Sequence, residues 1–350
     1  MIRESVQALH AYVPGEQPQE AGWVKLNTNE NPFLHPSVAE AVAEAATDAL
    51  RLYPDPLCLE LRAALSARYG VPPEQIICGN GSDELLTLAI RVAVGEGDRV
   101  AYPDPTYSLY ETLTRIQNGF PVPVPLGPSW ELPVEALAAV GAKLTLVVNP
   151  NAPTGTPYTL DTLGALASQV KGVLLIDEAY VDFGGHTALP LVALHENVLV
   201  LRTMSKAFGL AGVRLGYAFG PPALIEALYK IKDSYNVDRL TQVAGVAALR
   251  AFDAAAENNR QIAGRRDRLA GQLRERYGWR VWPSAANFLL ADTSPRPARE
   301  VYEGLKAQRV LVRYFARPRL DTCLRITIGS ESEVAALLAA LERLSAGLLR

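Results

Sequence analysis

The chain has 350 residues, of which 49% are hydrophobic, and its 34 basic and 37 acidic side chains give a formal net charge of −3. A chain of this length buries more core than one compact domain usually holds, so two domains are expected. The near balance of charge excludes the strongly positive surface that binds nucleic acid or an anionic membrane.

The first stretch, residues 1–30, is expected to be an irregular arm because prolines and glycines interrupt it. Its opening sequence, MIRESVQALHAYVPGEQ, contains no apolar run of the signal-peptide kind. An Ala-rich amphipathic pattern then predicts a helix over 37–52, ended by the sequence YPDP at 53–56. A second helix is expected over 58–69, ended by Gly70 and a pair of prolines.

A series of apolar runs follows and alternates with helical patterns. The runs are QIICG (75–79), RVAYP (99–103), LTLVVN (144–149), GVLLIDE (172–178), VLVLRT (198–203) and GYAFG (216–220). Helical patterns lie between several of them, as at 83–94 and 161–170. Near-continuous apolar strands separated by helices predict an α/β fold with a mostly parallel central sheet flanked by helices.

The last third of the chain predicts a smaller α/β domain. A long helix is expected over about 244–277, followed by strands at 286–292, 310–314 and 323–329 and by a terminal amphipathic helix. The expected division is therefore an N-terminal arm (1–30) that packs with the small domain or a partner chain, a large domain (31–240) and a small domain (241–350).

Cysteine and histidine positions limit the redox and metal chemistry. The three cysteines, odd in number and far apart, favour a reducing compartment over a disulfide framework. Neither ligand spacing nor a triad context marks the four histidines, His10, His35, His186 and His195. No metal site is therefore expected. No stretch reaches the roughly 18 uninterrupted apolar residues of a membrane span, and the protein is expected in the cytoplasm.

The segment LRTMSKAFGLAGVRLG (201–216) is the most informative one for chemistry. It follows a predicted buried strand and sets Lys206 near Thr203, Ser205 and Arg214. A lysine that forms imines must be kept from bulk water, so that its neutral amine is populated. The hydroxyls and the arginine suit a bound phosphate. The plainer alternative is a loop lysine beside a tight glycine turn. A Ser-Lys pair alone would favour this alternative, but the whole sixteen-residue segment favours the imine-forming lysine.

The sequence GNGSDE (79–84) lies between a predicted strand and a predicted helix. A helix N-terminus offers unpaired N–H groups and a partial positive charge, which suit a phosphate, and Ser82 and Asp83 would add contacts. A simple capping sequence is one alternative. A dinucleotide fingerprint is another, but Glu84 replaces its third glycine, and the acids about 20 residues on, Glu96 and Asp98, lie outside a clear strand end.

Eight motifs in a common order carry a family resemblance: KLNTNENP (25–32), RLYPDP (51–56), GNGSDE (79–84), PTYSLY (105–110), NPNAPTG (149–155), DEAYVDF (177–183), TMSKAFGLAGVRLGY (203–217) and CLRITIG (323–329). The sequence resembles the fold-type I pyridoxal-phosphate enzymes, specifically the class I/II aminotransferases and among them the histidinol-phosphate aminotransferase group. The resemblance runs from about Tyr12 to the C-terminal helix, and it implies pyridoxal 5'-phosphate as cofactor and a homodimer.

The resemblance also implies roles around the cofactor ring. Lys206 would hold the cofactor aldehyde as an imine and then move a proton between the substrate Cα and the cofactor C4′ as base and acid. Asp177 would pair with the pyridine nitrogen, Tyr107 would stack on the ring, and Tyr180 would bond the ring O3′. Each residue also has a plainer alternative: Asp177 could cap a loop, Tyr107 could lie in a surface turn, and Tyr180 could be a core residue.

The remaining cofactor contacts follow from the same resemblance. Tyr53 matches a residue that reaches the phosphate of the neighbouring subunit's cofactor, although it would otherwise simply close the preceding helix. Family members carry an asparagine next to proline as a donor to O3′, and this chain has Ala152 there. Either Asn151 takes over, or Tyr180 serves O3′ alone.

Substrate recognition is expected to depend on arginines. Arg325 matches the arginine that binds the substrate carboxylate, and Arg313 is a second anion contact or else a solvated edge-strand residue. Tyr12 and Asn29 from the arm would complete the pocket. The resemblance implies amino transfer between histidinol phosphate and 2-oxoglutarate, giving imidazole acetol phosphate and glutamate, in histidine biosynthesis.

Four other functions stay open at this point. An aromatic-amino-acid aminotransferase and a threonine-phosphate decarboxylase would use the same scaffold and the same lysine. A nicotinamide-dependent dehydrogenase would use the strand, GNGSDE and helix as its nucleotide site. An inactive scaffold protein would bind neither cofactor.

Overall fold

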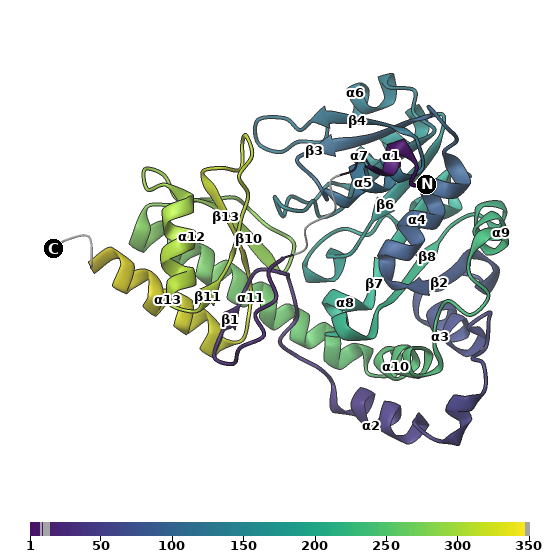
Figure 1. The fold of residues 1–350 in the computed structure, drawn as a ribbon, viewed down its shortest axis with the longest axis horizontal. Helices are drawn as coiled ribbons and strands as arrows, with labels where there is room; N and C mark the ends of the chain where they lie inside the picture. The colour runs from purple at the N-terminus through teal and green to yellow at the C-terminus, as the bar shows by residue number, and fades with distance from the viewer. Residues whose placement is uncertain (8, 10–14, 347–350) are drawn as a thin grey trace.

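The computed structural model describes residues 1–7, 9 and 15–346, and a seven-stranded sheet fills its larger part (Figure 1). The spatial order is β2-β8-β7-β6-β5-β3-β4. Strand β8 runs antiparallel to both neighbours, and the other neighbouring pairs are parallel. The mostly parallel sheet predicted from the apolar runs is confirmed. The strands are β2 (Ile76–Asn80), β3 (Arg99–Asp104), β4 (Phe120–Pro125), β5 (Leu144–Val148), β6 (Val173–Asp177), β7 (Val198–Thr203) and β8 (Leu215–Phe219).

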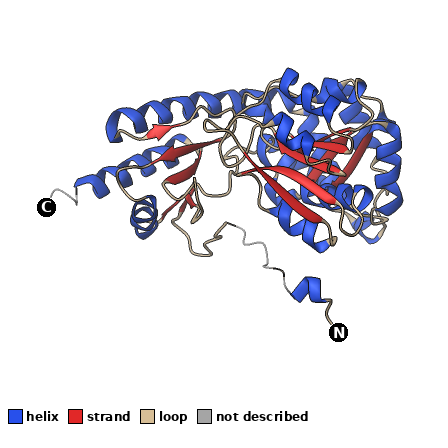
Figure 2. Ribbon diagram, turned by 90° about the horizontal axis from the view of Figure 1, so that it is seen from above, coloured by secondary structure: helices blue, strands red, loops and turns tan. Residues whose placement is uncertain are grey.

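Helices cover both faces of this sheet (Figure 2). Successive strand residues enter opposite cores: Leu174 and Ile176 join the core with α3, α7 and α10, whereas Leu175 joins the core with α4 and α9. Burial on both faces explains why these strands are apolar without alternation. The helices are α3 (Leu59–Tyr69), α4 (Gly81–Ala93), α5 (Leu109–Ile116), α6 (Val134–Ala139), α7 (Leu160–Gln169), α8 (Met204–Ala207), α9 (Pro222–Ile231) and α10 (Arg239–Arg250).

A smaller sheet follows in the last third of the chain. Its antiparallel order is β12-β13-β10-β9, made of β9 (Arg280–Val281), β10 (Phe288–Asp292), β12 (Arg313–Tyr314) and β13 (Cys323–Thr327). Helices α11 (Phe252–Tyr277), α12 (Ala298–Ala307) and α13 (Glu331–Ala346) pack with it. The N-terminal strand β1 (Val24–Lys25) pairs in parallel with β11 (Val310–Leu311). Short elements complete the chain: α1 (Glu4–Gln7), η2 (Pro73–Gln75), η3 (Val181–Phe183), η4 (Leu189–Ala193) and η5 (Ala211–Val213).

Two helix predictions were wrong in the same way, because each merged two helices. The pattern over 37–52 is α2 (Pro36–Ala45) followed by η1 (Asp48–Arg51), and Thr47 starts the second by accepting the N–H of Ala49 at 3.3 Å. The pattern over 244–277 is α10 and α11, which are separated at Ala251 (φ −92°, ψ 19°). The break lets α10 pack on α2 and α3 while α11 runs to the smaller sheet (Figure 1).

Two strand predictions also need correction. The run 310–314 is not one strand: β1 pairs with its first half and β13 with its second, in different sheets. Strand β4 is not among the expected strands, and its sequence FPVPVP has three prolines. It lies at the edge of the sheet, where a residue without an N–H is tolerated.

The division into an arm, a large domain and a small domain stays a prediction. Helix α10 contributes to the core of the larger sheet, and α11 contributes from Ile262 onward to the core of the smaller one. In the described part of the chain, none of the helices combines the length and the apolar character needed to cross a membrane.

Candidate active site

A cavity of about 450 Å³ opens where the carboxyl ends of the parallel strands meet the smaller sheet. Ligands bind at this edge in α/β proteins, because the strand ends and helix N-termini converge there. Twelve of the residues singled out in the sequence line this cavity: Asn29, Ser82, Asp83, Tyr107, Asp177, Tyr180, Thr203, Ser205, Lys206, Arg214, Arg313 and Arg325.

Lys206 lies on the short helix α8, directly after β7. Thr203 caps this helix, because its hydroxyl accepts the N–H of Ser205 at 3.1 Å. The Lys206 ammonium donates to the backbone oxygen of Thr28 at 2.9 Å. Burial, and after it the positive charge of Arg325, lowers the pKa of Lys206 to about 8. A usable fraction of neutral, nucleophilic amine is therefore present near neutral pH.

Asp177 ends β6 and is only 4% exposed. Its Oδ1 accepts the N–H of Ala179 at 3.0 Å, and its Oδ2 accepts the hydroxyl of Tyr110 at 3.2 Å. Burial raises the pKa of Asp177 to about 7, although both hydrogen bonds act in the opposite direction. A cationic partner in the cavity, such as a protonated pyridine nitrogen, would restore the ionised carboxylate.

Positive groups and free N–H donors converge at one end of the cavity, at the start of α4. Gly81 has φ +76°, and a Cβ there would lie 2.5 Å from Nη2 of Arg214. A Cβ on Gly216 would lie 2.5 Å from the backbone N of Ser82. The two glycines therefore let β8 and the guanidinium approach the helix N-terminus closely. Arg214 donates to Ser205 Oγ at 3.3 Å and to Asp83 Oδ2 at 3.3 Å. This end suits a phosphate group.

Two arginines face each other at the other end. Arg313 and Arg325 are direct partners across the antiparallel pair β12–β13. Their guanidinium carbons lie 5.6 and 5.7 Å from the centroid of the same ring, that of Phe315. Like charges directly opposite each other destabilise a sheet. Both side chains line the cavity, so an anion bound between them would offset this repulsion.

The N-terminal segment 27–29 forms the wall between these ends. The carbonyl of Asn27 accepts from Arg325 at 2.8 Å, and that of Asn29 accepts from Asn287 at 3.0 Å. Asn29 adopts φ +57°, and its amide donates to the hydroxyl of Tyr180 at 3.0 Å. This segment thus contributes backbone and side chain to the cavity.

Two of the expected site residues that the structure describes, Asn151 and Tyr53, are not brought to the cavity wall. Asn151 is fully buried beside it, and its amide donates to Pro105 O at 3.1 Å and to Thr154 Oγ1 at 3.0 Å. The neighbouring Ala152 lines the cavity instead, so Asn151 does not occupy the position expected of a ring donor. Tyr53 is 77% exposed and stacks on Tyr235 with ring centroids 4.3 Å apart. Tyr12 lies outside the described residues.

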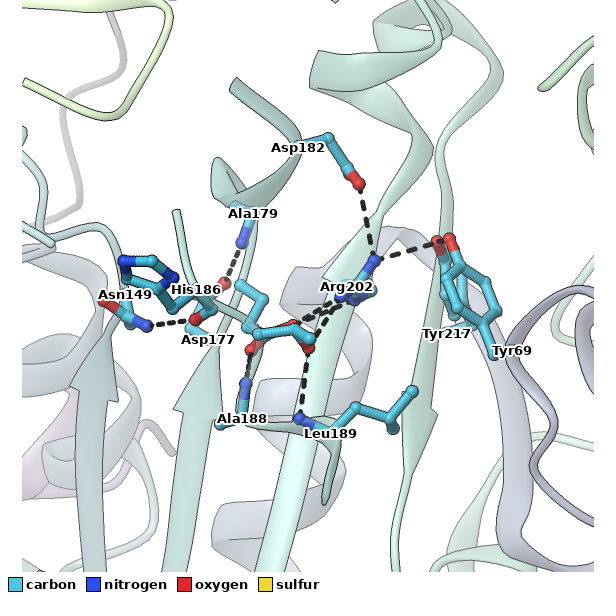
Figure 3. A network of polar contacts seen from close by, with 12 residues as sticks. Tyr69, Asn149, Asp177, Ala179, Asp182, His186, Ala188, Leu189, Arg202 and Tyr217 are labelled. Atoms are coloured by element: carbon cyan, nitrogen blue, oxygen red, sulfur yellow. Dashed lines mark hydrogen bonds and ion pairs between the residues drawn. The ribbon is translucent and has the colours of Figure 1, made fainter. Parts of the chain in front are cut away.

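A buried ion pair lies on the opposite face of the sheet from Asp177 and Thr203. Arg202 Nη2 lies 2.8 Å from Glu178 Oε2, and both side chains are 5% exposed or less. Figure 3 shows Arg202 between Asp182 and the hydroxyl of Tyr69, at 3.5 and 3.4 Å. The pair follows from side-chain alternation along β6 and β7. Arg202 and Glu178 were not singled out from the sequence. The signal that could have found the pair is the arginine inside the apolar run 198–203.

The donor set fits pyridoxal phosphate. The cavity is lined by phosphate-type donors at the start of α4, by the buried carboxylate of Asp177 and by the buried amine of Lys206. Tyr107 borders the same space and donates to Asp83 Oδ1 at 3.3 Å. Among the described residues, no three His, Cys, Asp or Glu side chains gather as metal ligands.

Comparisons with known proteins agree with this geometry. The sequence pattern of the family "Aminotransferase class I and II" matches residues 21–341. "Histidinol-phosphate aminotransferase 1" of Trichormus variabilis is 43% identical over 336 residues, 95% of each chain. The crystal structure of histidinol-phosphate aminotransferase from Sinorhizobium meliloti, in complex with pyridoxal-5'-phosphate, superposes with a TM-score of 0.91 at 28% identity and covers 99% of this chain and 98% of that one. A tetra mutant of Thermus thermophilus aspartate aminotransferase gives a TM-score of 0.82 at 26% identity and 98% coverage of both chains.

Proposed function

Because the chain belongs to the class I and II aminotransferases, we propose that it transfers the amino group of histidinol phosphate to 2-oxoglutarate. The products are imidazole acetol phosphate and glutamate, and the reaction serves histidine biosynthesis. The cofactor is pyridoxal phosphate. The relatives that are 41–43% identical along nearly the whole chain carry the name of this activity.

Different residues of the cavity bind different parts of the cofactor. Ser82, Ser205 and Arg214 bind its phosphate, and Asp177 pairs with its ring nitrogen. When bound, pyridoxal phosphate supplies an aldehyde that captures amines and a ring that accepts electrons from the substrate carbon. Lys206 holds the aldehyde, and its freed amine removes and returns the proton on the carbon that carries the amino group.

Tyr107 and Tyr180 line the same cavity and would complete the contacts to the ring, Tyr107 by stacking and Tyr180 by a hydrogen bond to O3′. Asp83 and Thr203 support the phosphate end, since Asp83 accepts from Arg214 and Thr203 holds the start of α8. Asn151 acts indirectly, through the loop that it ties to Pro105.

The observation that carries the substrate assignment is the facing pair Arg313 and Arg325. Each half-reaction brings an anion to the same place: a phosphate with histidinol phosphate, and carboxylates with glutamate. A pair of guanidinium groups on adjacent strands binds either one, because the fork geometry matches both anions. Asn29 and Tyr12 of the arm would close the pocket over the substrate.

A panel of amino donors tests this proposal. The purified protein with pyridoxal phosphate and 2-oxoglutarate is offered histidinol phosphate, phenylalanine, tyrosine or threonine phosphate, and glutamate formation is measured. We expect the highest kcat/KM with histidinol phosphate. A higher value with the aromatic amino acids, or release of CO₂ from threonine phosphate, would instead assign one of the other activities of this scaffold.

The attachment point has its own test. Borohydride reduction of the loaded protein followed by peptide mapping should place the cofactor label on Lys206. The Lys206→Ala variant should lose the label and the turnover. A label elsewhere in the chain would remove the central assignment.

We also propose a homodimer located in the cytoplasm. The stretch 50–59 supports a dimer, because five of its apolar side chains are exposed and a second chain would take them out of water. The three buried cysteines are free thiols, as is usual in a reducing compartment.

A further inference from the structure

Tyr110 is a fully buried side chain, 0% exposed, next to the candidate active site. It is the second residue of α5, and its hydroxyl points to the end of β6, where it donates to Asp177 Oδ2 at 3.2 Å. It is the side-chain donor to Asp177 in the described residues, and the N–H of Ala179 is the backbone donor. The carboxylate is therefore fixed from two directions.

The ring of Tyr110 makes a second contact, with Tyr107. The two ring centroids lie 5.7 Å apart at an interplanar angle of 78°, the edge-to-face arrangement that aromatic pairs prefer. The backbone N–H of Tyr110 also donates to the carbonyl of Tyr107 at 3.2 Å. One rigid side chain thus touches both residues assigned to the cofactor ring, the one that stacks on it and the one that pairs with its nitrogen.

We propose that Tyr110 is a positioning residue for the cofactor ring, with its hydroxyl holding Asp177 and its ring edge holding Tyr107. The inference rests on the proposed roles of Asp177 and Tyr107 in the aminotransferase reaction. It assigns Tyr110 no contact with substrate or cofactor.

The chemistry of the two partners supports a permanent hydrogen bond. Burial, and after it the charge of Asp177, raises the pKa of Tyr110 well above its usual range, so the phenol stays a neutral donor at every working pH. The Tyr110 hydroxyl in turn lowers the pKa of Asp177 against the effect of burial. Without this hydroxyl, Asp177 would be protonated more often, and a protonated carboxyl group cannot pair with a protonated pyridine.

Tyr110→Phe removes only the hydroxyl oxygen, and the chain supplies a matched control. Tyr102 on β3 is also buried, at 5% exposure, and packs edge-on against Tyr110 with centroids 6.2 Å apart. Its hydroxyl has no hydrogen-bond partner within the described residues. Tyr102→Phe therefore removes a buried hydroxyl from the same aromatic cluster without removing a bond to Asp177.

The first measurement is the dissociation constant of pyridoxal phosphate from the cofactor-free variants. The Tyr110 hydroxyl lowers the pKa of Asp177, and the loss of one hydrogen bond to a carboxylate typically weakens an equilibrium by about tenfold, so we expect about tenfold weaker binding for Tyr110→Phe. Tyr102→Phe should bind the cofactor as tightly as the unmodified protein does. In steady-state assays, Tyr110→Phe should lower kcat about tenfold and leave KM for the amino donor nearly unchanged.

A double-mutant cycle separates positioning from general packing. In an Asp177→Ala background the hydroxyl has no carboxylate to hold, so adding Tyr110→Phe should no longer weaken cofactor binding. Tyr110→Leu removes the ring edge as well, and the visible circular dichroism of the bound cofactor should change further than in Tyr110→Phe.

Three results would overturn the inference: unchanged affinity and kcat in Tyr110→Phe, an equal loss in Tyr102→Phe, or the same loss in the Asp177→Ala background. Failure of the proposed function has a different signature. In that case the unmodified protein itself would bind no pyridoxal phosphate or transfer no amino group, and the inference would fall with it.

Discussion

Burial shifts two residues of the active site toward their neutral forms. It lowers the pKa of Lys206 to about 8 and raises that of Asp177 to about 7. For the lysine the shift supplies a nucleophilic amine, and for the aspartate it leaves a carboxylate that gains from a cationic partner. The charged forms of Lys206 and Asp177 both lower the stability of the cofactor-free protein. The active site is therefore less stable before the cofactor binds than a neutral cluster of the same shape would be.

The sign of this effect for Asp177 gives a testable prediction. Between pH 3.8 and about 7 the native carboxyl group binds more protons than the unfolded one, so stability falls as pH rises through this window. Asp177→Asn removes the buried charge and keeps an acceptor for Ala179. We expect the cofactor-free variant to be more stable at pH 8 by up to about 4 kcal/mol, from a shift of about three units at about 1.4 kcal/mol each.

Chemical unfolding of the cofactor-free protein at two pH values measures this difference. At pH 5 more than half of the penalty is absent, and the gain should be about 3 kcal/mol smaller than at pH 8. Asp321→Asn, at an exposed carboxylate, should change the free energy of unfolding relative to the unmodified protein by the same amount at both pH values. An Asp177→Asn variant with equal gains at both values would show that its effect does not come from the charge.

At the scale of elements, the pair Arg202–Glu178 joins β6 and β7 just where the strands deliver Asp177 and Thr203 to the cavity. Glu178 also accepts the hydroxyl of Thr187 at 2.9 Å and the backbone N–H of Ala188. The carboxylate is thus bonded to Arg202 on β7 and to two residues of the loop before η4, at the point where the ladder of the parallel strands ends. The pair links the two strand ends on the face opposite Asp177 and Thr203.

Breaking this pair should cost much more than breaking an exposed one. Arg202→Met leaves Glu178 charged and buried without its cation, for which a loss of about 3–5 kcal/mol is typical. Adding Glu178→Gln removes the orphaned charge and should recover a large part of that loss in urea unfolding. Lys230→Met breaks an exposed helical pair with Glu226 and should leave the free energy of unfolding nearly unchanged. Equal losses in the single and double variants would argue against a buried charge as the cause.

The elements that could be predicted from the sequence are those whose signal is local. Buried parallel strands appear as apolar runs, and their positions were right within one or two residues. The break at Ala251 has no glycine or proline to mark it, because packing of α10 on α2 and α3 decides it. In strand β4 the local signal is misleading, because its prolines suggest a loop. The segment can be a strand because it lies at the edge of the sheet.

The site follows the same rule. Lys206, Asp177 and Arg214 stand in motifs, so their place at the cavity could be expected. Tyr110 is the last residue of the motif PTYSLY, and its role could not be predicted. Only the fold brings α5 against the end of β6, where the Tyr110 hydroxyl meets Asp177. Asn151 was expected only as a possible substitute for the missing asparagine at Ala152, and the backbone turns its side chain into the protein instead.

At the scale of the whole molecule, the cavity combines parts that are distant in sequence. The larger sheet supplies the lysine and the phosphate end, the smaller sheet supplies the arginine pair, and the arm supplies the wall between them. Tyr53 is the expected contributor that this assembly leaves outside. Its exposed ring lies in an apolar stretch with Leu50, Leu52 and Leu57, which are 44–51% exposed. A second copy of the chain would cover this stretch and bring Tyr53 to the partner's cavity.

A single charge placed in this stretch tests the dimer and the role of Tyr53 together. Leu52→Glu puts a carboxylate where a dimer would bury an apolar side chain, so we expect a monomer in sedimentation velocity. Since each monomer then lacks the partner's Tyr53, pyridoxal phosphate should bind about tenfold more weakly, as for one lost hydrogen bond to a phosphate. Leu194→Glu, at a leucine that is 72% exposed outside this stretch, should leave both properties unchanged. A variant that stays dimeric would place the interface elsewhere, and a monomer with full cofactor affinity would show that Tyr53 does not reach the neighbouring phosphate.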